Sequence, residues 1–209
     1  MKKIFTYALV MMMSMMSMTT LTSCNTEDEI IADYLTTGDW EGYLGAYVTN
    51  RWGEAFSDGQ YMTVWHFDAE GYSNGRAVWG YGEEVDYNRY SRRDAAYSTF
   101  RWEVRNGNIY IEYDASGWAP VRIDYYDYKI SRSRFSGVMY DWADRIYEFD
   151  LTNTYFNWSP YASGYWARTR GADGTDAEGV PVVVLDDGKC VLRGKFAEEY
   201  LKKNKEVSE

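Results

Sequence analysis

Apolar and polar residues alternate over short segments between Gly38 and Thr152, and turn-forming residues separate these segments. Such alternation is typical of strands that bury one face, and regularly spaced short strands are typical of a β-sandwich or β-barrel. The chain is therefore expected to be mostly β. Eight antiparallel strands are predicted, at 38–48, 61–68, 72–80, 96–105, 108–114, 121–130, 134–141 and 144–152.

The residues around Asn106-Gly107 predict one hairpin in detail. Asn-Gly is the preferred two-residue type I′ turn, because both of its positions need a positive φ. A loop of this length fixes the register and places an apolar row and a charged row on opposite sides of the ribbon. The apolar row pairs Phe100 with Tyr113, Trp102 with Ile111, and Val104 with Ile109.

A second hairpin is predicted around residues 131–134, with Ile130 opposite Phe135 and Tyr128 opposite Gly137. Upstream of it, the apolar residues alternate in the opposite phase. One extra residue would reconcile the two phases, so a β-bulge is predicted near Tyr126-Asp127.

Beyond Thr152 the alternation weakens. Residues 153–179 are predicted to form a long loop, and 180–185 with 190–192 a small hairpin. Residues 196–204 predict one short helix, in which Glu198 and Lys202 have a favourable spacing. The expected organisation is a barrel over 36–152 and a C-terminal extension over 153–209.

The N-terminal residues resemble an export signal that ends in a lipidated cysteine. Lys2 and Lys3 precede an apolar stretch over 4–18, and Leu21-Thr22-Ser23-Cys24 follows it. The order is typical of a secretory signal, and its cysteine ending resembles a bacterial lipobox. The resemblance implies cleavage after residue 23, a lipid on Cys24 and membrane attachment. A transmembrane helix is the alternative, but it needs about 20 apolar residues and this stretch is shorter.

Residues 24–35 are predicted to form an acidic tether. Glu27-Asp28-Glu29 resembles the acidic signal that sends lipoproteins of Bacteroidota to the cell surface. The resemblance implies an outer-membrane protein that is lipid-anchored and exposed on the surface. The periplasmic face of that membrane is the alternative location, and a solvated linker is the alternative reading of the acids.

Composition narrows the classes of partner. The formal net charge is −10, which disfavours binding to nucleic acid and to anionic membrane surfaces. The chain holds 21 Tyr and 9 Trp, residue types that favour strands. Cys190 is the only cysteine besides Cys24, so no internal disulfide is expected.

The first predicted strand begins with Gly38-Asp39-Trp40, and a G-x-W at the start of an eight-stranded meander resembles the lipocalins. The likeness extends to residues 67–71, the hairpin at 102–111 and the segment 128–137. Together these residues resemble the small lipocalin-like lipoproteins of Bacteroidota. The resemblance implies an up-and-down antiparallel barrel with Trp40 closing one end, and it implies no particular ligand.

The predicted barrel interior leads to three hypotheses for function. An eight-stranded barrel holds one small ligand or is filled by its own side chains. The first hypothesis is a non-enzymatic, lipid-anchored envelope lipoprotein whose barrel binds a small apolar ligand. If the barrel is instead filled, the protein would be a structural partner of an envelope complex, which is the third hypothesis. The candidate ligand-binding residues inside the barrel are Trp40, Trp65, Phe67, Phe100, Trp102 and Tyr113.

The second hypothesis is a surface module for glycan binding or adhesion. It rests on the aromatic residues of segment 155–166, where Trp158, Tyr161 and Trp166 are the candidate surface contacts. These rings either stack on sugars or cover the mouth of the barrel. The cover is favoured, because buried rings gain more than exposed ones.

Catalytic and metal chemistry are not expected. A triad would have to use His66, the only histidine, which alternation places on the outer face. The adjacent acids at 83–84 and 186–187 do not define the separation that glycosidases need. The acidic loop at 173–178 does not match a calcium-binding pattern. Arg89, Arg92 and Arg93 either contact an anionic ligand or balance neighbouring acids. No cofactor is predicted.

Overall fold

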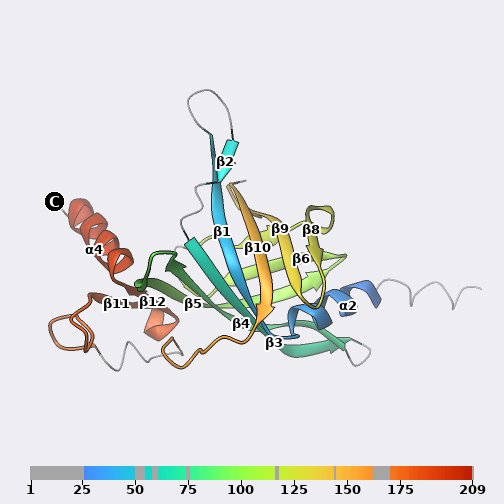
Figure 1. Ribbon diagram of the computed structural model, residues 1–209, viewed down its shortest axis with the longest axis horizontal. Coiled ribbons are helices and arrows are strands. Elements are labelled where there is room, and N and C mark those ends of the chain that lie inside the picture. Colours follow the sequence, from blue (N-terminus) through green and yellow to red (C-terminus); the bar gives the residue numbers. More distant parts are fainter. Residues whose placement is uncertain are drawn as a thin grey trace, which may run out of the picture.

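Eight antiparallel strands close into a barrel in the computed structural model, which describes residues 26–49, 55–57, 61–73, 76–115, 118–143, 145–161 and 170–208 (Figure 1). The predicted fold class is confirmed, and the strands of the ring follow chain order. They are β1 (Asp39–Thr49), β3 (Tyr61–Ser73), β4 (Arg76–Asn88), β5 (Ser91–Arg105), β6 (Asn108–Tyr113), β7 (Val121–Ile123), β9 (Arg134–Asp141) and β10 (Ile146–Thr154), which pairs with β1. Two of the short strands outside the ring each pair with one of its members: β2 (Ala55–Ser57) with β1, and β8 (Tyr128–Ile130) with β9.

Both predicted hairpins have the expected register. Asn106 and Gly107 have φ of 53° and 75°, as a type I′ turn requires. The cross-strand pairs include Trp102 with Ile111, and Tyr128 with Gly137. Local turn chemistry and side-chain alternation were sufficient to fix these two pairings.

The segment 121–130 differs from its prediction. Its change of phase is absorbed by the 3₁₀ turn η1 (Tyr125–Asp127), which separates β7 from β8, and not by a β-bulge. A turn of this kind shifts the phase of the following residues as an inserted residue would, so the sequence pattern alone did not distinguish the two.

The strands predicted at 61–68 and 72–80 imply a turn over residues 68–71, and this prediction is wrong, because β3 continues to Ser73 and pairs with β4 through two register shifts. Gly71 has a packing role there. A Cβ on Gly71 would lie 1.5 Å from Trp79 Nε1, so the missing side chain lets the Trp79 indole lie against β3. The strand predicted at 72–80 is consequently displaced, and β4 runs from Arg76 to Asn88.

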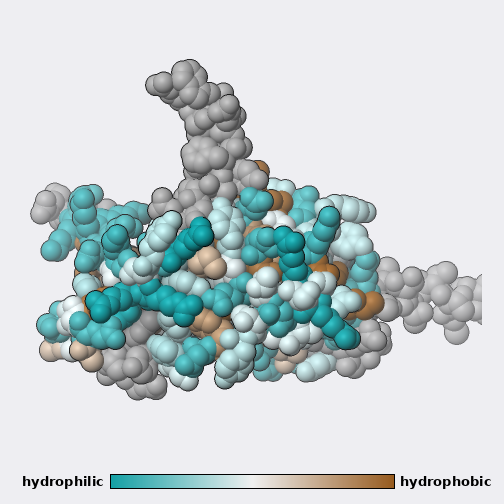
Figure 2. Space-filling model, viewed as in Figure 1, coloured by the Kyte–Doolittle hydropathy of each residue, from teal (hydrophilic) through white to brown (hydrophobic). Residues whose placement is uncertain are grey.

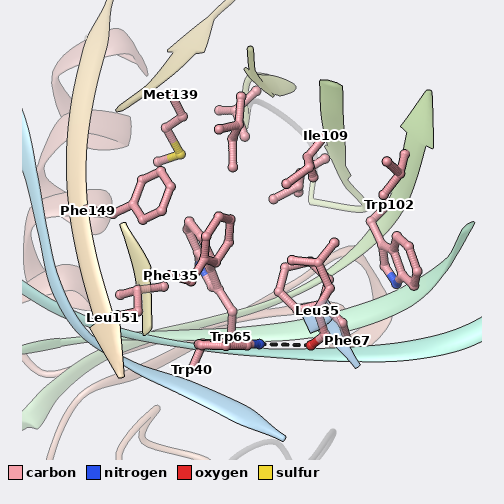
Figure 3. Close-up of a cluster of buried hydrophobic side chains, with 14 of the residues drawn as sticks. Leu35, Trp40, Trp65, Phe67, Trp102, Ile109, Phe135, Met139, Phe149 and Leu151 are labelled. Carbon is pink, nitrogen blue, oxygen red and sulfur yellow. Dashed lines mark hydrogen bonds between the residues drawn. The ribbon is translucent and has the colours of Figure 1, made fainter. Parts of the chain in front are cut away.

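One end of the barrel is filled by a continuous aromatic and aliphatic core (Figure 3). Trp65, Phe135 and Phe149 lie within it, with ring centroids 4.7–6.0 Å apart and inclined to one another. The core also carries side chains of β6 and β9, such as Ile109 and Met139. This burial of apolar rings supplies the main stabilisation of the barrel.

The residues predicted as a tether form instead the helix α2 (Thr26–Leu35), which closes that end of the barrel. Ile31, Ala32 and Leu35 are buried in the barrel core. The Trp40 indole Nε1 donates a hydrogen bond of 2.8 Å to the Leu35 carbonyl oxygen, shown as the dashed line in Figure 3. The helix α2 and Trp40 therefore close this end of the barrel together.

An acidic side chain of α2 also holds the hairpin turn. Asp28 accepts hydrogen bonds from the backbone N–H groups of Asn106 and Gly107, at 3.0 and 2.6 Å. These two N–H groups lie in a turn, where no strand partner is available to them. The acidic run that resembles a cell-surface localisation signal thus also has a structural contact in the fold.

The C-terminal extension adds to the same sheet. Its predicted hairpin is β11 (Val182–Leu185) and β12 (Cys190–Arg193), joined by the 3₁₀ turn η2 (Asp186–Gly188). β12 pairs with β5 over residues 95–98, the part of β5 that β6 leaves unpaired. The predicted helix is α4 (Lys195–Ser208), which lies on the opposite side of the molecule from α2 (Figure 1).

The surface is mainly polar. Figure 2 shows a largely hydrophilic face with small hydrophobic areas. Within the described residues, neither helix is both long enough and apolar enough to cross a bilayer.

Candidate ligand pocket

The structure separates the predicted interior residues into two groups. Five of them pack against one another or their neighbours with 0–2% of their surface exposed, which leaves no space for a ligand among them. These five are Trp40, Trp65, Phe67, Phe100 and Trp102. The sixth, Tyr113, lines an open pocket at the other end of the barrel.

This pocket has a volume of about 290 Å³ and opens to solvent. Apolar side chains, which include Leu44, Val121 and Met139, form part of its wall. The Trp118 ring packs against the Tyr113 ring at 5.1 Å and contributes from the segment between β6 and β7. The pocket is therefore a shallow cup above a solid core.

Two carboxylates of β4 face this pocket. Glu84 and Asp86 are two residues apart on one strand, so they share its inward face. Glu84 is 2% exposed and accepts hydrogen bonds from the hydroxyls of Thr63 and Tyr113. Asp86 Oδ1 is buried and has no hydrogen-bond partner. A buried acceptor without a donor is costly, and such groups are uncommon in folded proteins.

Burial governs the protonation of this pair. It raises the pKa of Glu84, although hydrogen bonds from Tyr113 and Thr63 oppose the rise. Burial, followed by the charge of Glu84, raises the pKa of Asp86 well above its usual value. A carboxyl with a higher pKa in the folded chain favours folding at low pH, and that contribution is lost as the pH rises through the folded-state pKa. Burial therefore favours the protonated form of both carboxyls, and a bound cation would favour the ionised form.

The charged groups at the mouth do not neutralise this pair. Arg145 Nε donates a hydrogen bond of 2.6 Å to Asp141 Oδ2. Burial opposes a low pKa at Asp141, but the hydrogen bonds from Arg145 and Ala143 lower it overall. Arg145 is the only cationic side chain among the described pocket residues, and its partner is Asp141.

The aromatic segment after β10 covers the outer wall of the barrel and not its mouth. Trp158 and Tyr161 are half-buried, and the Phe156 ring packs against both. Together they contact an apolar cluster on the outer faces of β3, β4 and β5, which includes Val64, Val85 and Tyr97. Of the other predicted site residues, Trp166 and Cys24 lie outside the described residues.

Asp39 holds this aromatic segment against the barrel wall through hydrogen bonds. The sequence did not identify it as a candidate residue. It is 6% exposed. Its carboxylate accepts hydrogen bonds from Trp158 Nε1, at 2.8 Å, and from the Phe156 backbone N–H, at 2.7 Å. His66 Nδ1 lies 2.8 Å from the same carboxylate. His66 is thus on the outer face as predicted, and it belongs to this structural contact.

The other charged motifs are engaged in ion pairs. Arg193 is buried, and its guanidinium donates hydrogen bonds to Asp176 at 2.7 Å and to Glu178 at 2.9 Å. These two acids of the loop at 173–178 therefore already have a cationic partner. Arg92 lies 3.6 Å from Glu41, and Arg93 4.0 Å from Glu178. Within the described part of the chain, no set of three or more His, Cys, Asp or Glu side chains is placed to hold a metal ion. Burial raises the pKa of the Cys190 thiol to about 12.

Neither protein-family models nor curated proteins match this chain.

Proposed function

We propose that this protein is a non-enzymatic, lipid-anchored lipoprotein of the bacterial cell envelope that binds a small molecule in the open end of its barrel. The pocket of about 290 Å³ carries the proposal. Small-molecule sites begin at about 300 Å³ and combine apolar walls with a few convergent polar groups. Leu44, Val121 and Met139 supply the walls, and Glu84 and Asp86 supply the polar groups. The filled core beneath them keeps the cup rigid.

The anchoring part of the proposal rests on the lipobox-like residues that end at Cys24. In a host that processes lipoproteins, Cys24→Ser is expected to move the protein from the membrane pellet to the soluble fraction, because the lipid would be lost. Fractionation followed by immunoblotting measures this. Cys190→Ala is the matched control, since Cys190 is buried in the fold, and it should still pellet with membranes. Unchanged pelleting of Cys24→Ser would refute lipidation there.

Ligand binding is tested by filling the pocket. The full chain purified from its native host is expected to carry a noncovalent added mass in native mass spectrometry, and Ala119→Trp should abolish it. Ala119 lines the pocket, whereas Ala143 is exposed in the turn between β9 and β10. Ala143→Trp is therefore the matched control and should retain the added mass. A bare mass for the unmodified chain would contradict the proposal.

A glycan-binding surface remains a second candidate, on residues other than those predicted. Trp79 and Tyr81 of β4 are each 44% exposed, and their rings lie 6.2 Å apart beside a surface hollow of about 590 Å³. The contact of Trp79 with Gly71 holds its indole against the sheet, which presents a fixed ring to solvent. Sugars stack on such rings through their C–H faces. A glycan screen with Trp79→Ala tests this candidate, and unchanged glycan binding would exclude it.

A further inference from the structure

We propose that the ligand of the barrel pocket is a small organic cation, an amine or ammonium compound with an apolar body, whose charged group binds between Glu84 and Asp86. The inference rests on the proposed function, since it names the chemical class of the ligand in that same pocket.

The charged groups of the pocket favour a cation. Glu84 and Asp86 lie side by side on β4 and both face the cavity. Asp141 is a third carboxylate of the wall, and it pairs with Arg145. No other cation of the described chain lines the pocket. A buried charge is tolerated when it is paired, so the two carboxylates of β4 favour a positively charged occupant.

The hydrogen bonding of the two carboxyls favours a ligand that carries donors. Both Glu84 oxygens already accept hydrogen bonds from protein hydroxyls, whereas Asp86 Oδ1 is buried without a donor. An alkylammonium group carries N–H donors and a positive charge, so it would donate a hydrogen bond to Asp86 Oδ1 and favour the ionised form of both carboxyls. A purely apolar ligand would leave this oxygen unsatisfied.

The aromatic wall of the pocket also suits an organic cation. Tyr113, Trp118 and Tyr147 line the same cavity as the carboxylates. Aromatic faces attract organic cations, and they pack equally well against alkyl chains. Burial raises the pKa values of Tyr113 and Tyr147, so both phenols stay neutral near pH 7 and add no competing charge. Carboxylates, phenols and indole together match an ammonium group with an apolar body.

Other ligand classes fit less well. An anion would disfavour ionisation of Glu84 and Asp86, and only the paired Arg145 would attract it. A bare metal ion needs more oxygen or nitrogen ligands than this pair offers, and the described residues provide no group of three such side chains.

Three probes of equal length separate these classes: n-pentylamine, n-pentanol and n-pentanoate, titrated into the full chain by calorimetry at pH 7.5. Pentylamine is expected to bind at least tenfold more tightly than pentanol, and pentanoate more weakly than both. Asp86→Asn should reduce amine affinity at least tenfold and leave pentanol affinity unchanged. Glu112→Gln is the matched control, because Glu112 is exposed on the outer face of β6 and should leave all three affinities unchanged.

The pH dependence of amine affinity is a second measurement, and a purely structural role of Asp86 would not change it. Amine affinity should fall as the pH is lowered through the raised pKa values of Glu84 and Asp86, because the protonated carboxyls lose their charge. Tyr113, Tyr147, Asp141 and Arg145 are the other titratable groups facing them. Pentanol affinity should change little over the same range.

The outcomes distinguish this inference from the proposal beneath it. If pentanol binds as tightly as pentylamine and Ala119→Trp blocks both, the pocket binds ligands but the inferred cation specificity is wrong. If no probe binds and the native chain shows no added mass, the proposed function fails as well. Preferential binding of pentanoate would overturn the charge argument.

Discussion

Replacing Trp40 by alanine is expected to lower the free energy of unfolding by about 3–5 kcal/mol, the usual cost of truncating a fully buried tryptophan. Trp40 is 0% exposed, and its ring packs edge-on against Phe135 with centroids 5.8 Å apart. Its indole Nε1 also donates a hydrogen bond to the carbonyl oxygen of Leu35, and this oxygen would lose its donor in Trp40→Ala. The substitution therefore removes packing and loosens the contact between α2 and the barrel.

Urea denaturation followed by circular dichroism measures this loss. Trp142→Ala is the control, because Trp142 is 77% exposed, and we expect a change within about 0.5 kcal/mol. Trp40→Phe retains much of the ring but not the N–H donor, so it should fall between the two. A loss below about 1 kcal/mol for Trp40→Ala would show that Trp40 does not close the barrel.

Replacing Asp39 by alanine is expected to lower the free energy of unfolding by about 3–6 kcal/mol, since two hydrogen bonds to a carboxylate are lost at about 1.5–3 kcal/mol each. The donors are the Phe156 backbone N–H and Trp158 Nε1. Both would lie against the barrel wall without their acceptor. We therefore expect the segment that carries Phe156 and Trp158 to separate from β3 and β4 before the barrel itself unfolds.

Limited proteolysis and thermal denaturation test this order of events. Cleavage within 155–161 should become faster in Asp39→Ala at temperatures where the barrel remains folded. The control is Asp150→Ala, which removes an exposed ion pair with Arg134 and should cost less than about 1 kcal/mol. Equal stability and equal cleavage of Asp39→Ala and the unmodified chain would contradict the proposed role of Asp39.

The features of the barrel that could be predicted from the sequence are those that depend on residues close together in the chain. The turn at Asn106-Gly107 and the alternation on its two sides fix a register without help from the rest of the chain. The turn at 68–71 was misjudged because Asp and Gly are turn residues. Gly71, however, is needed for the approach of Trp79, a contact that only the folded sheet creates. Similarly, α2 looked like a solvated acidic tether, because the burial of Ile31 and Leu35 depends on the open end of a barrel formed much later in the chain.

The pocket was harder to predict than the core. Interior aromatic residues were identified as candidates, but most of them fill the barrel, and sequence alternation does not distinguish a lining ring from a packed one. Glu84 and Asp86 were missed because the predicted third strand ended at residue 80. Continuing the alternation along β4 to Asn88 would have placed both acids on its inner face. In Gly38-Asp39-Trp40, the family resemblance assigns a role only to Trp40, whereas the Asp39 carboxylate has an equally specific role on the outer face of the barrel.

The short sequence separation between Cys24 and the start of α2 has a consequence for orientation. The helix begins at Thr26, so the chain from Cys24 to the helix spans at most about 7 Å. With a lipid on Cys24, the plugged end of the barrel would rest close to the headgroups, with no long stalk to let the molecule turn over. The cup would then face away from the bilayer, and its ligand would enter from the aqueous side.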